Sequence, residues 1–89
     1  MALTVYDNVV LERLEQELVL LNLGTGTYYA LNRTGAEVFE MLRSHELEEV
    51  VDRISCKYSK PCGEVRDDVR RLLAELVRCG LIDQAQCPI

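Results

Sequence analysis

One short segment, residues 25–35, constrains the fold more than any other part of the chain. It opens with a turn for which Gly24 and Gly26 supply the backbone freedom that a hairpin needs. The β-formers and aromatics of Thr27–Leu31 follow, and Asn32 is then a favoured N-cap for an apolar helical pattern. A strand therefore feeds directly into a helix with no catalytic residue between them, which indicates a recognition surface rather than an active site.

Length and composition narrow the class of protein. The 89 residues predict one domain over residues 1–89, and a hydrophobic content of 48% argues against disorder. A net charge of −5 disfavours a nucleic-acid partner, because such binding depends on neutralising phosphates. The sequence shows neither an apolar run of membrane-spanning length nor a signal peptide, so we expect a cytoplasmic protein with no membrane partner.

The cysteine and histidine positions give little support to a metal site or a catalytic centre. His45 is the only histidine, and the four cysteines contain no Cys-x-x-Cys pair. We expect Cys56, Cys62, Cys79 and Cys87 to be free thiols; a disulfide between Cys56 and Cys62 is sterically allowed by the spacing but disfavoured in a reducing cytosol. No nucleophile can be matched with a base, and no glycine-rich phosphate loop leads into a helix. The sequence therefore predicts no catalytic residue, no metal and no cofactor.

The first third of the chain predicts a three-stranded antiparallel meander. Its strands are expected at Val9–Leu14, Glu17–Leu23 and Thr27–Leu31. The middle strand is apolar on consecutive residues, Leu18–Leu21, so both of its faces are expected to be covered, as for a central strand. The third strand then has a free edge that carries no Pro, Lys or other blunting feature. Either that edge is open, or the N-terminus or another segment covers it.

Three helices are expected after the sheet. The first runs from Thr34 to Arg43, and Ser44 is the expected cap of the second, whose apolar positions follow a helical period. The third runs from about Glu64 to Cys79 and is ended by Gly80 as a C′ glycine.

The third helix has a wide apolar face that permits two interpretations. One stripe is expected to face the core and comprises Val65, Val69, Leu72 and Leu76. Leu73 and Val77 widen it on the side that also carries Arg66 and Arg70. This flank is either more core or the lining of a groove beside the open strand edge.

The motifs along the chain resemble those of the PqqD family. The similarity rests on Thr-Gly-Thr-Tyr-Tyr-Ala-Leu-Asn-Arg-Thr-Gly-Ala, on a following helix with Val38, Phe39 and Leu42, and on the ending Arg78-Cys79-Gly80-Leu81-Ile82. It spans Val9 to Ile82, and its most specific parts are Tyr29-x-Leu31-Asn32-x-Thr34-Gly35 and Gly80-Leu81. Phe39 stands where many relatives carry tryptophan, which keeps a large aromatic in the core.

The resemblance implies an α+β, winged-helix-like domain with a three-stranded antiparallel sheet followed by three helices, with strands at about 9–31 and helices at about 34–79. It implies that the domain binds the leader segment of a ribosomally synthesised precursor peptide, which adds as a strand to the third strand and lies against the third helix. Carried over by position, the peptide-binding residues are Thr27, Tyr28, Tyr29, Ala30, Leu31, Arg66, Arg70, Leu73 and Val77. Arg66 and Arg70 would pair with leader carboxylates.

The resemblance also implies processing partners. In lasso peptide biosynthesis these are a leader peptidase and a cyclase, and this setting is favoured here; the alternative is a chaperone for a radical SAM maturase. A winged-helix DNA-binding regulator is a third interpretation, but the start of the third helix, Glu64–Asp68, is as acidic as it is basic. A small enzyme would need a nucleophile and base that the chain does not offer.

Overall fold

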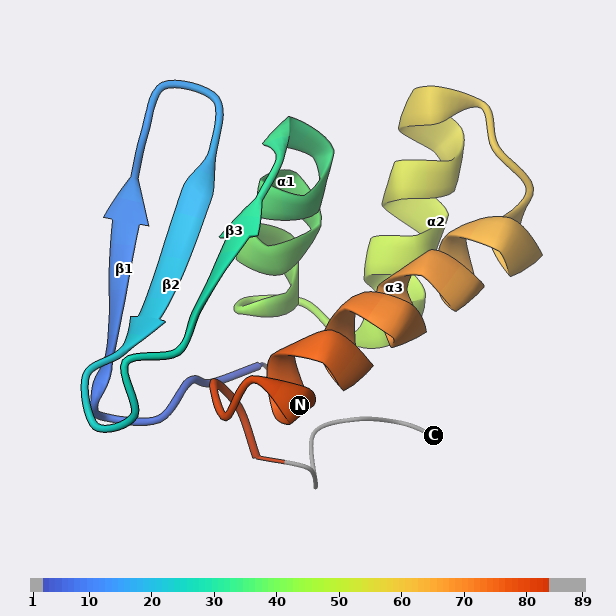
Figure 1. Cartoon of the computed structure of the whole chain (residues 1–89). Helices are drawn as coiled ribbons and strands as arrows, with labels where there is room; N and C mark the ends of the chain where they lie inside the picture. Colours follow the sequence, from blue (N-terminus) through green and yellow to red (C-terminus); the bar gives the residue numbers. More distant parts are fainter. Residues whose placement is uncertain (1–2, 84–89) are drawn as a thin grey trace.

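The computed structural model describes residues 3–83 as a three-stranded sheet followed by three helices (Figure 1). The strands are β1 (Val9–Arg13), β2 (Leu18–Asn22) and β3 (Tyr28–Leu31). The helices are α1 (Arg33–Leu42), α2 (Leu47–Tyr58) and α3 (Cys62–Arg78). The predicted α+β fold is confirmed, and the likeness to a winged helix is a loose analogy. None of the three helices is long and apolar enough to cross a bilayer.

The sheet is an antiparallel meander in the order β1-β2-β3, so β2 is central, as predicted. Of the two turn glycines, Gly26 has a φ of 78° and needs the left-handed conformation. Gly24 has no positive φ; a Cβ at this position would lie 2.9 Å from the Asn8 side-chain nitrogen, so a larger residue would displace the Asn8 side chain. The sequence argument about backbone freedom is thus right for Gly26 and wrong for Gly24.

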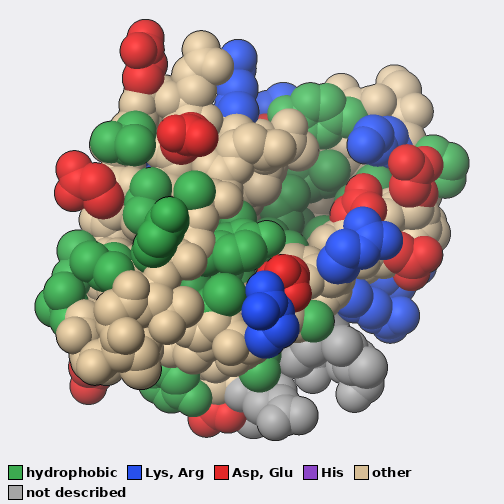
Figure 2. Space-filling view, viewed as in Figure 1, with side chains coloured by type: hydrophobic (Ala, Val, Ile, Leu, Met, Phe, Trp, Pro, Cys, Tyr) green, Lys and Arg blue, Asp and Glu red, His purple; other side chains and the backbone are tan. Residues whose placement is uncertain are grey.

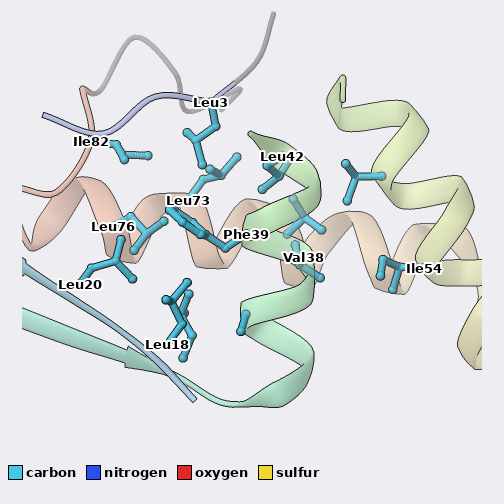
Figure 3. Close-up of a cluster of buried hydrophobic side chains, with 14 of the residues drawn as sticks. Leu3, Leu18, Leu20, Val38, Phe39, Leu42, Ile54, Leu73, Leu76 and Ile82 are labelled. Atoms are coloured by element: carbon cyan, nitrogen blue, oxygen red, sulfur yellow. The ribbon is translucent and has the colours of Figure 1, made fainter. Parts of the chain in front are cut away.

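The core lies between one face of the sheet and the helices, and Figure 3 shows Leu20 and Leu18 pointing toward Phe39 and Leu76. The prediction that both faces of β2 are covered is wrong for the outer face. There the side chains of Val19 and Leu21 are only half-buried, because all three helices pack on the opposite side of the sheet (Figure 1).

The helix ends follow local chemistry, with one exception. Asn32 caps α1 as predicted, and its side chain accepts a 2.8 Å hydrogen bond from the Gly35 amide. The N-cap of α2 is Glu46, not Ser44. Ser44 instead belongs to the turn that ends α1, where its amide donates to the Met41 carbonyl at 3.1 Å.

The end of α3 confirms the role of Gly80. Its φ is 72°, and the amides of Gly80 and Leu81 donate to the carbonyls of Val77 and Leu76 at 3.0 and 2.9 Å. This pair of hydrogen bonds is the Schellman motif, which satisfies the last carbonyls of the helix.

Three of the four cysteines lie within the described residues, and all three are free thiols. The Cys62 thiol lies 3.4 Å from the Ser55 hydroxyl, and no disulfide joins Cys62 to Cys56. Cys87 lies outside the described residues.

Candidate functional site

The outer edge of β3 is unpaired within residues 3–83, since the sheet ends at this strand. The N-terminal segment does not cover it. The Leu3 amide donates to the Leu42 carbonyl at 2.7 Å, and the Tyr6 amide donates to the Leu81 carbonyl at 3.2 Å. Residues 3–8 therefore follow the ends of α1 and α3, and for this described part of the N-terminus the interpretation in which it shields the third strand is wrong.

Hydrogen bonds at both ends of the β1–β2 pair fix which way the backbone groups point. The Leu14 amide donates to the Glu17 carbonyl and the Leu23 amide donates to the Asn8 carbonyl, each at 2.9 Å. Hydrogen-bonded positions alternate along an antiparallel pair. The backbone N–H and C=O groups of the odd-numbered residues of β2 therefore point toward β1, and those of the even-numbered residues point toward β3. The Asn22 amide, which donates to the Thr27 carbonyl at 2.8 Å, agrees with this register.

The same alternation carries across to β3. Tyr29 and Leu31 lie opposite Leu20 and Leu18, so their backbone groups face β2. The backbone N–H and C=O groups of Tyr28 and Ala30 point to the open edge. A peptide that extends the sheet would therefore hydrogen-bond to these two residues.

The two outer edges of the sheet differ in chemistry. β1 ends in Glu12 and Arg13, both exposed, and charged side chains discourage the addition of another strand. β3 carries no charge along Tyr28–Leu31. The edge of β3 is thus the one suited to an added strand.

A groove of about 480 Å³ runs beside β3 and separates it from α3. Tyr29 and Leu31 form one wall, and Val65, Val69 and Leu72 form the other. Figure 2 shows hydrophobic side chains in the hollow between the sheet and α3, with charged groups along the helix side of its rim. The buried part of the lining also includes Val38 of α1 and Ile54 of α2, while the rim includes Tyr58, Lys60 and Asp68.

Leu73 lies in the core and does not line this groove. It is 3% exposed and points toward Phe39 and Leu76 (Figure 3). Leu72, assigned from the sequence to the core stripe, is half-buried and lines the groove. The buried stripe is centred on Val65, Val69, Leu73 and Leu76, so α3 is rotated relative to the expectation.

The other predicted residues of α3 lie away from the groove as well. The Arg66 guanidinium pairs with the Glu48 carboxylate of α2 at 2.6 Å, which raises the pKa of Arg66 and lowers the pKa of Glu48. Arg70 is exposed, and Val77 packs against the core. None of Arg66, Arg70, Leu73 and Val77 is brought together with Tyr29, Ala30 and Leu31 around the groove.

The groove side of α3 carries charges that are already paired with each other. The Arg71 guanidinium lies 3.1 Å from the Asp68 carboxylate, and the Arg78 guanidinium lies 2.9 Å from that of Glu75. Hydrogen bonding from Arg78 lowers the pKa of Glu75. Such exposed ion pairs each contribute only about 0–1 kcal/mol of stability, so breaking one to pair its arginine or carboxylate with another molecule costs little.

The lining is mainly apolar contact surface with a few polar side chains at its rim. At the rim, the Tyr58 hydroxyl donates a 2.6 Å hydrogen bond to the carboxylate of Glu37, which lies on α1. Hydrogen bonds from Lys57 and Tyr58 lower the pKa of Glu37. Across residues 3–83, no three His, Cys, Asp or Glu side chains gather in a way that could hold a metal ion.

Known proteins match the chain at the level of family and fold. The profile of the family described as coenzyme PQQ synthesis protein D (PqqD) matches residues 17–82. A solved structure of TbiB1 in complex with the TbiA(beta) leader peptide is 34% identical, with a TM-score of 0.81 over 94% of this chain and 96% of that one. A structure of lasso peptide synthetase B1 complexed with the leader peptide has the same fold at 21% identity, with a TM-score of 0.84 over 91% of this chain and 96% of that one. No curated protein sequence matches the chain significantly.

Proposed function

The chain belongs to the PqqD family, and from this premise we propose that it binds the leader segment of a ribosomally synthesised precursor peptide and presents it to lasso-type processing enzymes. In this role the protein is a binding partner and performs no chemistry of its own. The observation that carries the proposal is the unpaired β3 edge beside an apolar groove. The 34% identical relative whose structure holds a leader peptide supports it.

The leader adds to the sheet as a fourth strand. Its backbone hydrogen-bonds to the outward groups of Tyr28 and Ala30, and these bonds supply affinity with little dependence on sequence. Side chains alternate across a strand, so every second leader residue enters the groove and contacts Leu72 and Tyr29. Specificity then comes from how those side chains fit the groove.

Calorimetry with a synthetic leader peptide of the cognate precursor tests the proposal. We expect a dissociation constant between nanomolar and micromolar, roughly −8 to −12 kcal/mol. An absence of binding at high micromolar peptide would contradict it. A scrambled leader of the same composition is the control for non-specific adhesion.

We further propose that the outer face of the sheet receives the leader peptidase. The six outward positions of the three strands contain one charge, Glu12, whereas the solvated face of an antiparallel sheet is normally polar. Val10 is 42% exposed and Tyr28 is 67% exposed, opposite the half-buried Leu21. A leader strand added to β3 would enlarge this face, so the peptidase would contact this protein and the leader peptide at the same time.

The rate of leader removal by the cognate leader peptidase tests this contact. Val10→Glu should leave leader affinity unchanged and slow leader removal at least tenfold, because a charge would sit in an apolar interface. Arg70→Glu, a charge change on an exposed part of α3, is the matched control. Equal rates for the Val10 variant and the wild type would contradict the placement.

The DNA-binding interpretation is not favoured. The helix that would enter the major groove, α3, carries four acidic residues, Glu64, Asp67, Asp68 and Glu75, against four arginines. Those arginines include Arg66, Arg71 and Arg78, each paired with a carboxylate. Few charges remain to neutralise phosphates.

A further inference from the structure

The two walls of the groove are held by different neighbours. β3 packs on β2 and α1, whereas the main helical neighbour of α3 is α2. The distance between β3 and α3 therefore depends on whatever joins the sheet to α3. An added strand needs both walls at once, since it must lie about 4.8 Å from β3 while its side chains reach the helix.

Asn22, the last residue of β2, makes such a connection. It is the one polar residue among the buried residues of the described chain and is 5% exposed. Its side-chain nitrogen donates a 2.8 Å hydrogen bond to the Gly80 carbonyl, just beyond the end of α3. The left-handed conformation of Gly80, with a φ of 72°, gives that carbonyl its direction.

The side-chain oxygen of Asn22 holds the turn that leads into β3. It accepts hydrogen bonds from the amides of Gly24 at 2.8 Å and Thr25 at 3.1 Å, and from the Asn8 side chain at 3.0 Å. The Asn22 side-chain amide thus contacts both walls of the groove. Its oxygen holds the turn before β3, and its nitrogen holds the C-terminal end of α3.

We propose that Asn22 is a positioning residue for the leader peptide, which sets the distance and angle between β3 and the C-terminal end of α3. This inference rests on the proposed function. Asn22 lies under the turn and does not line the groove, so it acts on the leader only through the two walls. Apolar packing of Leu73 and Leu76 holds α3 against the sheet without direction, whereas the hydrogen bond to Gly80 is directional.

Asn22→Asp separates the two roles of the side chain. A carboxylate keeps the acceptor for Asn8, Gly24 and Thr25 but cannot donate to the Gly80 carbonyl at neutral pH. We expect leader affinity by calorimetry to fall about tenfold or more at a temperature where the variant is fully folded. Asn8→Ala is the matched control, because it removes one bond to the same oxygen and leaves the link to α3; its affinity should stay within about twofold of the wild type.

The orientation of α3 relative to the sheet can be measured without the leader. Residual dipolar couplings of the backbone amides of α3 and of the sheet report this orientation in the free protein. They should report a reoriented α3 in Asn22→Asp and an unchanged one in Asn8→Ala. Gly80→Ala, which strains the left-handed residue from the helix side, should reproduce the reorientation if the Asn22 variant does not fold. An unchanged α3 orientation, or affinity losses that simply follow the loss of stability in both Asn variants, would overturn the inference. A wild-type chain that binds no leader would overturn the proposed function instead, while the couplings still decide the role of Asn22.

Discussion

One flank of α3 packs against α2, whereas the other borders the groove beside β3. The α2 flank carries Arg66, which pairs with Glu48 of α2. Leu73 lies next to this flank and points into the core toward Phe39 of α1. The groove flank carries Asp68 and Leu72, which line open space. Both flanks offer one leucine and nearby charges, so residue type does not distinguish them; the neighbours that each flank meets in the fold decide which is structural and which can bind.

The largest expected difference between the flanks is in folding. Leu73→Glu should unfold the protein, because a charge buried without a partner costs more than about 4 kcal/mol, a large part of the stability of a small domain. Thermal melts followed by circular dichroism measure it. Leu76→Glu should behave alike, and a cooperative melt for Leu73→Glu near that of the wild type would place Leu73 outside the core.

The groove flank should respond in binding rather than in folding. Leu72→Glu should keep a cooperative melt and weaken leader affinity by about 2 kcal/mol, the contribution of burying a leucine side chain. Calorimetry with the synthetic leader measures the loss. Arg70→Glu is the control on the other side of the helix and should bind nearly normally; a larger loss for Arg70→Glu than for Leu72→Glu would restore the flank first expected from the sequence.

A proline scan of β3 extends the comparison to the strand wall. Ala30→Pro removes an N–H that points to the open edge. Leader binding should weaken by about 0.5–1.5 kcal/mol, the contribution of one hydrogen bond, while the melt stays cooperative. Tyr29→Pro removes an N–H that faces β2 and should lower the melting temperature instead. Calorimetry and melts on both variants decide between the registers, because the reverse assignment would exchange the two outcomes.

The smallest effect concerns the ion pair on the α2 flank. Hydrogen bonding from Arg66 holds the pKa of Glu48 below its unfolded value, so the pair contributes stability above the unfolded pKa and loses it as the pH falls through the folded one. The melting temperatures of wild type and Glu48→Gln should therefore differ slightly at neutral pH and converge in acid. Leader affinity should be the same for both, and a clear drop for Glu48→Gln would give this flank a part in binding.

Local signals in the sequence were enough for the elements of the fold. Three predicted features depend only on residues close together in the chain, and all three are confirmed. They are the strand that leads into Asn32, the hydrogen bond by which Asn32 caps α1, and the end of α3 at Gly80. The free edge of β3 followed from strand order, which short connections impose. Ser44 failed as a cap because α1 ends in a turn that uses this residue first.

The site was predicted only in part because its helix wall depends on contacts between distant segments. Periodicity assigned a wide apolar face to α3 but could not tell which edge of that face enters the core, so Leu72 and Leu73 exchanged roles. Asn22 gave no signal, since an asparagine at the end of a strand is an ordinary turn residue until Gly80 is known to lie beside it. The apolar outer positions of β2 suggested a covered face that the described residues leave open.

Amide hydrogen exchange of β3, with and without leader peptide, tests most directly whether the leader adds as a strand. The amides of Tyr28 and Ala30 should gain protection when the leader binds, whereas those of Tyr29 and Leu31 should be protected already by β2. New protection confined to the three helices, with Tyr28 and Ala30 still exchanging freely, would contradict strand addition and leave the groove as the site of a helical peptide.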